Sequence, residues 1–154
     1  IGLTSGTTRE PKATMHFHRD ILATCDSYGR HVLRAKADDR FIGSPPLAFT
    51  FGLGGLAIFP LRFGATATLL ENASPANMVQ IIETYKATIS FTAPTAYRAM
   101  MAAMEQGANL SSLRLAVSKS FKSVGGLSVG FVCLSVKRGF MSSGNFTFFE
   151  KSKS

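Results

Sequence analysis

The order in which hydrophobic periodicity changes along the first three quarters of the chain constrains its fold more than any other feature. Segments that alternate apolar and polar residues, as strands do, take turns with segments whose apolar residues recur every three to four positions, as in helices. The expected strands cover residues 13–17, 41–43, 65–70, 88–91 and 113–117. Because parallel neighbours need crossover connections, this order predicts an α/β fold with a parallel, helix-covered sheet.

The expected helices differ in how clearly they are signalled. The clearest begins at Ser74, whose hydroxyl can cap it, and Pro75, which suits the first helical position. Another begins at Pro94, with Gly107 as its stop. Two more are expected over residues 18–33 and 52–59, and Pro60 should disturb the second of these.

Each helix has an expected apolar face. For residues 18–33 it comprises Ile21, Leu22, Cys25, Tyr28 and Val32. For the helix after Ser74 it comprises Met78, Val79, Ile82 and Tyr85, and for the helix after Pro94 it comprises Tyr97, Met100, Met101 and Met104. A methionine stripe can serve as a soft ligand surface, but helical spacing favours a core face packed on the sheet.

The motif richest in chemistry runs from Thr4 to Lys12, with the sequence TSGTTREPK. Its hydroxyls can donate hydrogen bonds, Gly6 lets backbone amides approach an anion, and Lys12 adds a positive charge. These groups could cradle phosphate, although the spacing is neither that of a P-loop nor that of a dinucleotide fingerprint. A polar surface turn is the alternative that composition alone leaves open.

The same segment resembles the signature of the adenylate-forming (AMP-binding) superfamily, Thr-Ser-Gly-Thr-Thr-Gly-x-Pro-Lys-Gly. Arg9 and Ala13 stand where that signature has its two later glycines, and the other seven specified positions match. The resemblance implies that this loop holds the phosphates of ATP. The phosphate-binding residues would then be Thr4, Ser5, Gly6, Thr7, Thr8 and Lys12. Arg9 could strain the loop or add a phosphate contact.

A second segment, Pro46 to Gly54, resembles the family loop in which an aromatic residue or histidine gates the carboxylate pocket, a position that Phe49 takes here. An apolar core loop is the alternative. The wider sequence resembles aryl-CoA ligases, particularly those for benzoate or 2-aminobenzoate, and Phe49, Thr50 and Phe51 would form a flat apolar wall for an aromatic ring. Ala93 belongs to a further segment that resembles a strand end near this pocket.

The resemblance implies a fragment of the large N-terminal domain of an acid–thiol ligase that uses ATP, Mg²⁺ and coenzyme A to form an acyl-adenylate, releasing AMP when acyl-CoA forms. No general base or nucleophile is identified in this chain, which suits a reaction in which the carboxylate itself attacks. The later Tyr-Gly-x-Thr-Glu motif and the catalytic lysine are not found in it, so the fragment itself is expected to be inactive. A non-catalytic nucleotide-binding module and a plain interaction module are the alternatives.

The family pattern is expected to cover residues 1–118 and to stop there. Of the net charge of +8, the tail 119–154 carries +5, together with eight serines and five glycines. The hypothesis is a truncated or frame-shifted reading; the rival is a basic appendage that contacts nucleic acid or an anionic membrane. The basic residues are not interleaved with aromatics, which favours the first and predicts no nucleic-acid partner.

The remaining features predict a cytoplasmic protein. Cys25 and Cys133 form neither a disulfide framework nor a metal-site spacing, and no leader or membrane span is identified. His16 and His18 alternate without a nearby carboxylate or cysteine, so no metal site is expected, and a packing or capping role is favoured for His18. The incomplete sheet should expose apolar surface and promote self-association.

Overall fold

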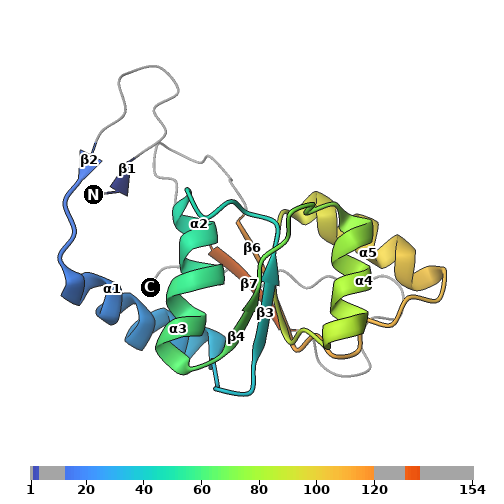
Figure 1. The fold of residues 1–154 in the computed structure, drawn as a ribbon, viewed down its shortest axis with the longest axis horizontal. Coiled ribbons are helices and arrows are strands. Elements are labelled where there is room, and N and C mark those ends of the chain that lie inside the picture. The colour runs from blue at the N-terminus through green and yellow to red at the C-terminus, as the bar shows by residue number, and fades with distance from the viewer. Residues whose placement is uncertain (1, 4–12, 120–130, 136–154) are drawn as a thin grey trace, which may run out of the picture.

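The computed structural model describes residues 2–3, 13–119 and 131–135 of the chain. In this part of the chain a five-stranded sheet has helices packed on both faces, and a two-stranded pair stands apart from it (Figure 1). The predicted α/β class with a parallel, helix-covered sheet is confirmed.

The strand order of the sheet is β4-β3-β5-β6-β7, and the first four strands are parallel. Their bounds are β3 (Arg40–Gly43), β4 (Thr66–Thr68), β5 (Ile89–Phe91), β6 (Leu115–Lys119) and β7 (Phe131–Ser135). Strand β7 pairs antiparallel with β6 and was not predicted, because it lies in the tail, for which the sequence analysis proposed no elements.

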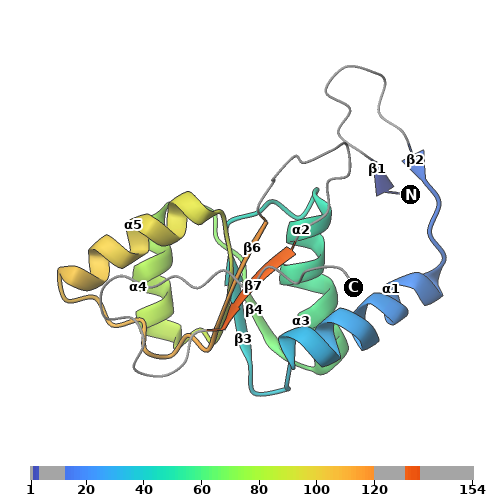
Figure 2. The ribbon, with the colours of Figure 1, turned by 180° about the vertical axis from the view of Figure 1, so that it is seen from behind.

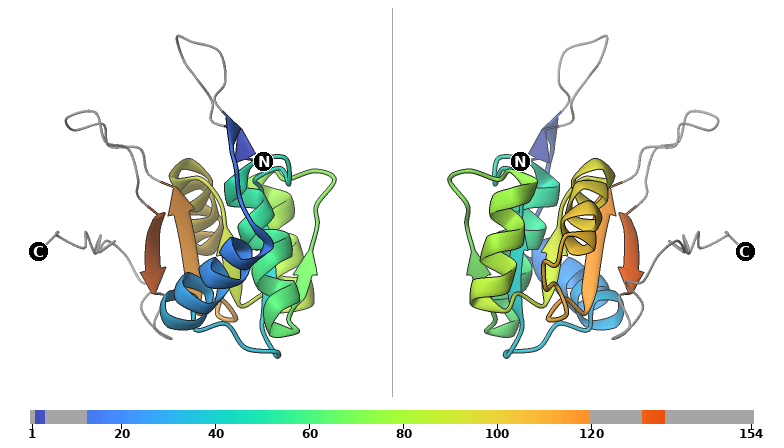
Figure 3. Two further views of the ribbon diagram at one scale, coloured as in Figure 1. Left: turned by 90° about the vertical axis from the view of Figure 1, so that its left-hand side faces the viewer. Right: turned by 90° about the vertical axis from the view of Figure 1, so that its right-hand side faces the viewer.

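The helices are divided between the two faces of the sheet by the direction of the crossovers. The chain passes from β3 to its neighbour β4, then back across β3 to β5, and on to β6. Because crossovers are right-handed, this reversal places the helices before and after β4 on opposite faces. Figures 2 and 3 show α2 and α3 on one face and α4 and α5 on the other.

The expected helix over residues 18–33 forms as α1 (His18–Thr24) followed by the π-helix η1 (Cys25–Leu33). The wider π-helical turn brings residues four apart into line, so Cys25, Gly29 and Leu33 are the buried ones. The predicted apolar face was therefore wrong in part. Ile21, Leu22 and Val32 of that face are exposed.

The N-terminus of α1 also differs from its expected form. The Asp20 carboxylate accepts a hydrogen bond from the backbone N–H of Phe17 at 2.9 Å, while His18 is exposed. The favoured packing or capping role of His18 was therefore wrong. The capping contact comes from Asp20, in the first turn of α1, whose carboxylate reaches back to the N–H of Phe17.

Pro60 lies inside a continuous helical segment and does not end it. The segment comprises α2 (Thr50–Leu53), the π-helix η2 (Gly54–Ile58) and α3 (Phe59–Phe63). The N–H of Phe59 donates to the carbonyl of Gly54, five residues back, so the helix is widened just before the proline ring. The expected disturbance takes the form of a π-helical turn.

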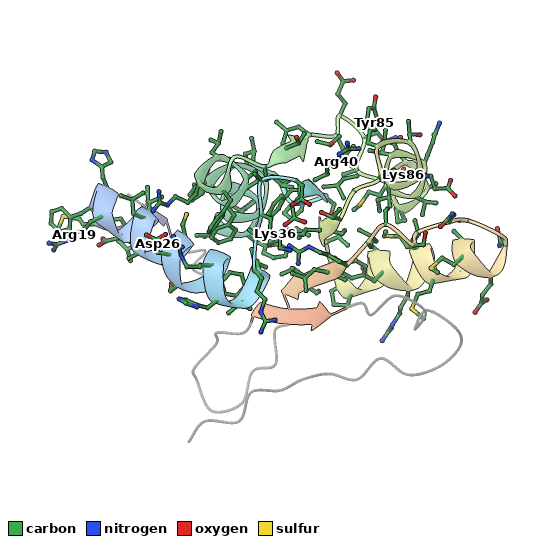
Figure 4. All side chains as sticks on the ribbon, turned by 90° about the horizontal axis from the view of Figure 1, so that it is seen from below. Arg19, Asp26, Lys36, Arg40, Tyr85 and Lys86 are labelled. Atoms are coloured by element: carbon green, nitrogen blue, oxygen red, sulfur yellow. The ribbon has the colours of Figure 1, made fainter. Side chains whose placement is uncertain are left out.

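Helix α4 (Pro75–Tyr85) begins as predicted, with the Ser74 hydroxyl accepting from the Asn77 N–H. Met78, Val79 and Ile82 are buried, but Tyr85 is exposed although it shares their helical face. Its carbonyl accepts from Nη1 of Arg40, the first residue of β3, at 2.6 Å (Figure 4). Tyr85 therefore lies at the amino end of β3, at the edge of the sheet, where its ring is exposed.

Helix α5 (Pro94–Glu105) carries the methionine stripe on the same face of the sheet as α4. Met100 is buried and Met104 packs against the same core, so the core interpretation of the stripe is confirmed. Gly107 follows with a φ of +102°, a backbone conformation that glycine adopts readily, which suits its expected role as a stop.

Candidate functional site

The carboxyl ends of β3 and β5 form the point at which the sheet topology reverses. These strands are hydrogen-bonded neighbours, yet the helix that follows β3 covers one face and the helix that follows β5 covers the other. The loops that leave the two strands therefore diverge, and ligands of open α/β sheets bind in the crevice between such loops. This carboxyl edge is the candidate site.

Hydroxyl side chains follow the central strands at this edge. The hydroxyls of Ser44, after β3, and Thr92, after β5, lie 2.5 Å apart. The Ser44 N–H donates to the carbonyl of Phe91 at 3.0 Å, and the Thr92 N–H donates to the carbonyl of Val117 at 3.1 Å. The ends of β3, β5 and β6 are thereby held together by both backbone and side-chain contacts.

Two further serines near this edge have buried hydroxyls with no hydrogen-bond partner among the described residues: Ser90 within β5 and Ser118 within β6. The register places both on the sheet face that also carries Ile42 and Ala116. Sequence analysis did not identify these hydroxyls or those of Ser44 and Thr92 as candidates. Ser44, Thr92 and Ser118 occupy the same step of three neighbouring strands, one residue after the paired Gly43, Phe91 and Val117. This alignment can be recognised only once the register is known.

The structure brings the predicted acid-pocket residues to this edge. Phe49 precedes the first residue of α2 and is 62% exposed, and Thr50, the first residue of that helix, is exposed as well. Ala93 precedes α5 and is also exposed. The ring of Phe51 packs against Phe91 at 5.4 Å between centroids, so it belongs to the core and not to the exposed wall.

Glycines let the loop before α2 fold tightly. A Cβ on Gly52 would lie 2.1 Å from the carbonyl oxygen of Pro46, and a Cβ on Gly55 would lie 2.5 Å from the ring of Phe91. The Phe49 N–H donates to that same Pro46 carbonyl at 3.1 Å. The lack of a side chain at Gly52 therefore lets the turn that carries Phe49 pack against α2, and the lack of one at Gly55 lets the helix pack against Phe91.

The predicted phosphate loop, with Thr4, Ser5, Gly6, Thr7, Thr8 and Lys12, lies outside the described residues. The strands on either side of it, β1 (Gly2–Leu3) and β2 (Ala13–Thr14), pair antiparallel with Leu3 opposite Ala13. Only Ala13–Thr14 of the expected strand 13–17 forms. Figures 1 and 3 show this pair at the same end of the molecule as the start of α2.

The opposite, amino edge of the sheet carries a dense ionic network. The Asp39 carboxylate, which is buried, accepts from the guanidinium of Arg114, from the Thr88 hydroxyl at 2.7 Å and from the Lys36 N–H at 2.9 Å. Burial raises the pKa of Asp39, but these hydrogen bonds outweigh it and the net pKa is lowered. Arg114 also donates to the carbonyls of Leu33 and Arg34 at the end of η1.

The other perturbed groups lie on η1, away from the carboxyl edge. Hydrogen bonds from Arg62 of α3 and from Arg30 lower the pKa of Asp26, and burial raises the pKa of the Cys25 thiol. Within the described residues, no group of three His, Cys, Asp or Glu side chains could hold a metal ion. None of the helices in that part of the chain is long and apolar enough to cross a bilayer.

Comparison with known proteins agrees with this geometry. The family model for AMP-binding enzymes matches residues 1–130. The benzoate–CoA ligase of Thauera aromatica is 37% identical over 99 residues, which are 64% of this chain and 19% of that protein. The anthranilate–CoA ligase of Pseudomonas aeruginosa is 32% identical over 116 residues, which are 75% of this chain and 22% of that protein.

Solved structures show the same arrangement. The crystal structure of the anthranilate CoA ligase AuaEII with anthranoyl-AMP matches with a TM-score of 0.68 and 40% identity, over 76% of this chain and 23% of that one. A benzoate CoA ligase from Burkholderia xenovorans matches with a TM-score of 0.56 and 30% identity, over 60% of this chain and 19% of that one. The chain thus spans about a fifth of the length of the curated relatives it matches, and it belongs to the family of AMP-binding enzymes.

Proposed function

We propose that this chain forms the phosphate-binding loop and one wall of the acid pocket of an ATP-dependent ligase that joins an aromatic carboxylic acid to coenzyme A. The observation that carries the proposal is the exposed ring of Phe49 at the topological switch point of the sheet. An aromatic side chain at such an edge suits an aromatic ring, and the relatives named above act on benzoate and anthranilate.

The nucleotide would be held at the same end of the molecule. The hydroxyls of Thr4, Ser5, Thr7 and Thr8, the amides around Gly6 and the ammonium of Lys12 form the donor set that phosphate needs. The pairing of β1 with β2 brings the two ends of this loop together, which suits a closed cradle. Mg-ATP, when bound, supplies the adenylyl group that activates the carboxylate.

The role of this chain's own residues in that chemistry is positional and electrostatic. The described carboxyl edge offers hydroxyls, an aromatic ring and small side chains, so the acid's carboxylate acts as its own nucleophile. Holding that carboxylate beside a bound phosphate removes the entropy cost of bringing the two together. Thr50 and Ala93 lie beside the proposed position of the acid ring, where small side chains leave room for it.

The acid-binding proposal is tested by titrating the 154-residue chain with sodium benzoate and with sodium acetate in a calorimeter. We expect benzoate to bind more tightly than acetate, and Phe49→Ala to weaken benzoate binding about fivefold, since a stacked aromatic contact contributes roughly 1 kcal/mol. Phe17→Ala is the matched control, because Phe17 is similarly exposed but lies before α1. Equal losses in both variants would contradict the assignment of Phe49.

Catalysis is tested separately from binding. The chain spans about a fifth of its relatives' length, so we propose that it binds Mg-ATP without turning it over. Calorimetric titration with Mg-ATP measures the binding, and a coupled assay for benzoate-dependent pyrophosphate release measures turnover. Pyrophosphate release would show that the chain is catalytic by itself. If the chain binds no nucleotide, the proposal fails and the alternative of a plain interaction module remains.

A further inference from the structure

The hydroxyl of Tyr97 lies between the backbones of β5 and β6 close to their carboxyl ends. Its oxygen is 2.7 Å from the carbonyl oxygen of Ser90, 3.0 Å from the carbonyl oxygen of Val117 and 3.1 Å from the Val117 nitrogen. The hydroxyl has one proton, so it donates to one of the two carbonyls while accepting from the Val117 N–H. The ring is almost fully buried in the core between the sheet and α5.

The hydroxyl is directly connected to the candidate site. The Val117 carbonyl that it approaches also accepts from the Thr92 N–H, and the Thr92 hydroxyl contacts Ser44. Tyr97 itself lies in the first turn of α5, where its N–H donates to the carbonyl of Ala93 at 3.3 Å. One side chain thus links the start of α5 to β5, which borders the candidate site, and to its neighbour β6.

Packing alone accounts for the ring of Tyr97 but not for its hydroxyl. Most of the side chains around the ring are apolar, so phenylalanine would fill the same volume. Burying a hydroxyl costs free energy unless it is hydrogen-bonded, and here it contacts backbone groups of Ser90 and Val117 near the ends of the strands. Such contacts fix where a backbone lies with respect to a helix.

We propose that Tyr97 is a positioning residue for the acid pocket: its hydroxyl holds the ends of β5 and β6, and with them Thr92, Ala93 and Ser118, in the geometry that receives the aromatic carboxylate. This inference rests on the proposed function for its ligand. The positioning effect itself is a property of the unliganded chain and can be measured without one.

The test compares Tyr97→Phe with Tyr85→Phe, an exposed tyrosine at the opposite edge of the sheet. The first readout is hydrogen–deuterium exchange of the Thr92 and Ser44 amides at the carboxyl edge and of the Thr88 amide at the amino edge. We expect Tyr97→Phe to accelerate exchange at Thr92 and Ser44 about tenfold more than at Thr88, because loss of a buried hydrogen bond is worth about that factor locally. Tyr85→Phe should leave all three unchanged.

The second readout is ligand affinity, measured where each variant is fully folded. Tyr97→Phe should weaken benzoate binding about tenfold and leave Mg-ATP binding within twofold. Equal acceleration of exchange at both edges would overturn the proposal. It would also be overturned if the wild-type chain binds benzoate and Tyr97→Phe binds it with the same affinity. If the wild-type chain binds no benzoate, the proposed function fails, and the exchange comparison still decides whether Tyr97 holds the strand ends.

Discussion

The two edges of the parallel sheet use polar side chains in opposite ways. At the amino edge, Asp39 accepts from Arg114, Thr88 and Lys36, and Arg114 donates in turn to the end of η1, so the charge of this buried carboxylate is matched. Near the carboxyl edge, the hydroxyls of Ser90 and Ser118 are buried without partners among the described residues, and Phe49 is exposed.

We interpret this difference as a division between one edge that stabilises the fold and another that binds a ligand. A buried polar group without a partner costs free energy, whereas a matched buried ion pair is costly to break. The ion pair of Asp39 with Arg114 therefore ties the sheet to η1 at the amino edge. The carboxyl edge has no ion pair among the described residues and presents hydroxyls and an exposed aromatic ring instead. Three substitutions test this contrast between the two edges.

The largest effect is expected from Arg114→Leu. It leaves the Asp39 carboxylate buried without its charge partner and frees the carbonyls at the end of η1, so the free energy of unfolding should fall by about 3 kcal/mol. Urea denaturation measures this. Arg30→Leu is the control, because Arg30 pairs with Asp26 at the surface, where solvent screens the charges, so this loss should be much smaller. A similar loss in both variants would remove the special role of the amino edge.

A smaller effect on stability is expected from Thr92→Val at the other edge. The substitution keeps the shape of a fully buried side chain and removes its hydrogen bond to Ser44, so it should cost about 1 kcal/mol. Benzoate affinity of the folded chain should nevertheless fall more in Thr92→Val than in Arg114→Leu. The reverse order of affinities, measured by calorimetry, would contradict the division between the two edges.

The smallest difference is a pH slope. Because the pKa of Asp39 is lower in the folded chain than in the unfolded one, its stabilising contribution is present above the unfolded value of about 4 and is lost as the pH falls through the folded value. Asp39→Asn should be less stable than wild type at pH 7, and the two unfolding free energies should converge below about pH 4. Parallel curves over this range would show that Asp39 is not held by its partners.

Local sequence signals predicted the elements whose causes are local. Ser74 and Pro75 start α4 where the capping chemistry requires, and the spacing of Met78, Val79 and Ile82 identifies its buried face. The same reasoning failed in part for residues 18–33. Ile21 and Leu22 lie in α1, where no residue is buried, and in the π-helix that follows the buried residues are Cys25, Gly29 and Leu33. It also failed for Tyr85, since periodicity does not indicate where a sheet ends.

For the candidate site, the sequence identified one side chain from each of the two loops that leave the switch point, Phe49 after β3 and Ala93 after β5, through their resemblance to family motifs. It did not identify Ser44, Thr92 or the hydroxyl of Tyr97. Single hydroxyl residues are common in loops and strands, and nothing in their neighbours distinguishes a residue that faces a ligand from one that faces the core.

Residues close together along the chain were enough to identify the family, the alternation of strands and helices, and a motif that resembles the phosphate loop of the family. The folded structure was needed to show which strands are neighbours and that the helices after β3 and β5 lie on opposite faces. It was also needed to show that one edge carries an ion pair and the other carries hydroxyls. The physical reason is sequence distance. Asp39 and Arg114 are separated by 75 residues and Ser44 and Thr92 by 48, and only packing of the sheet brings such partners together.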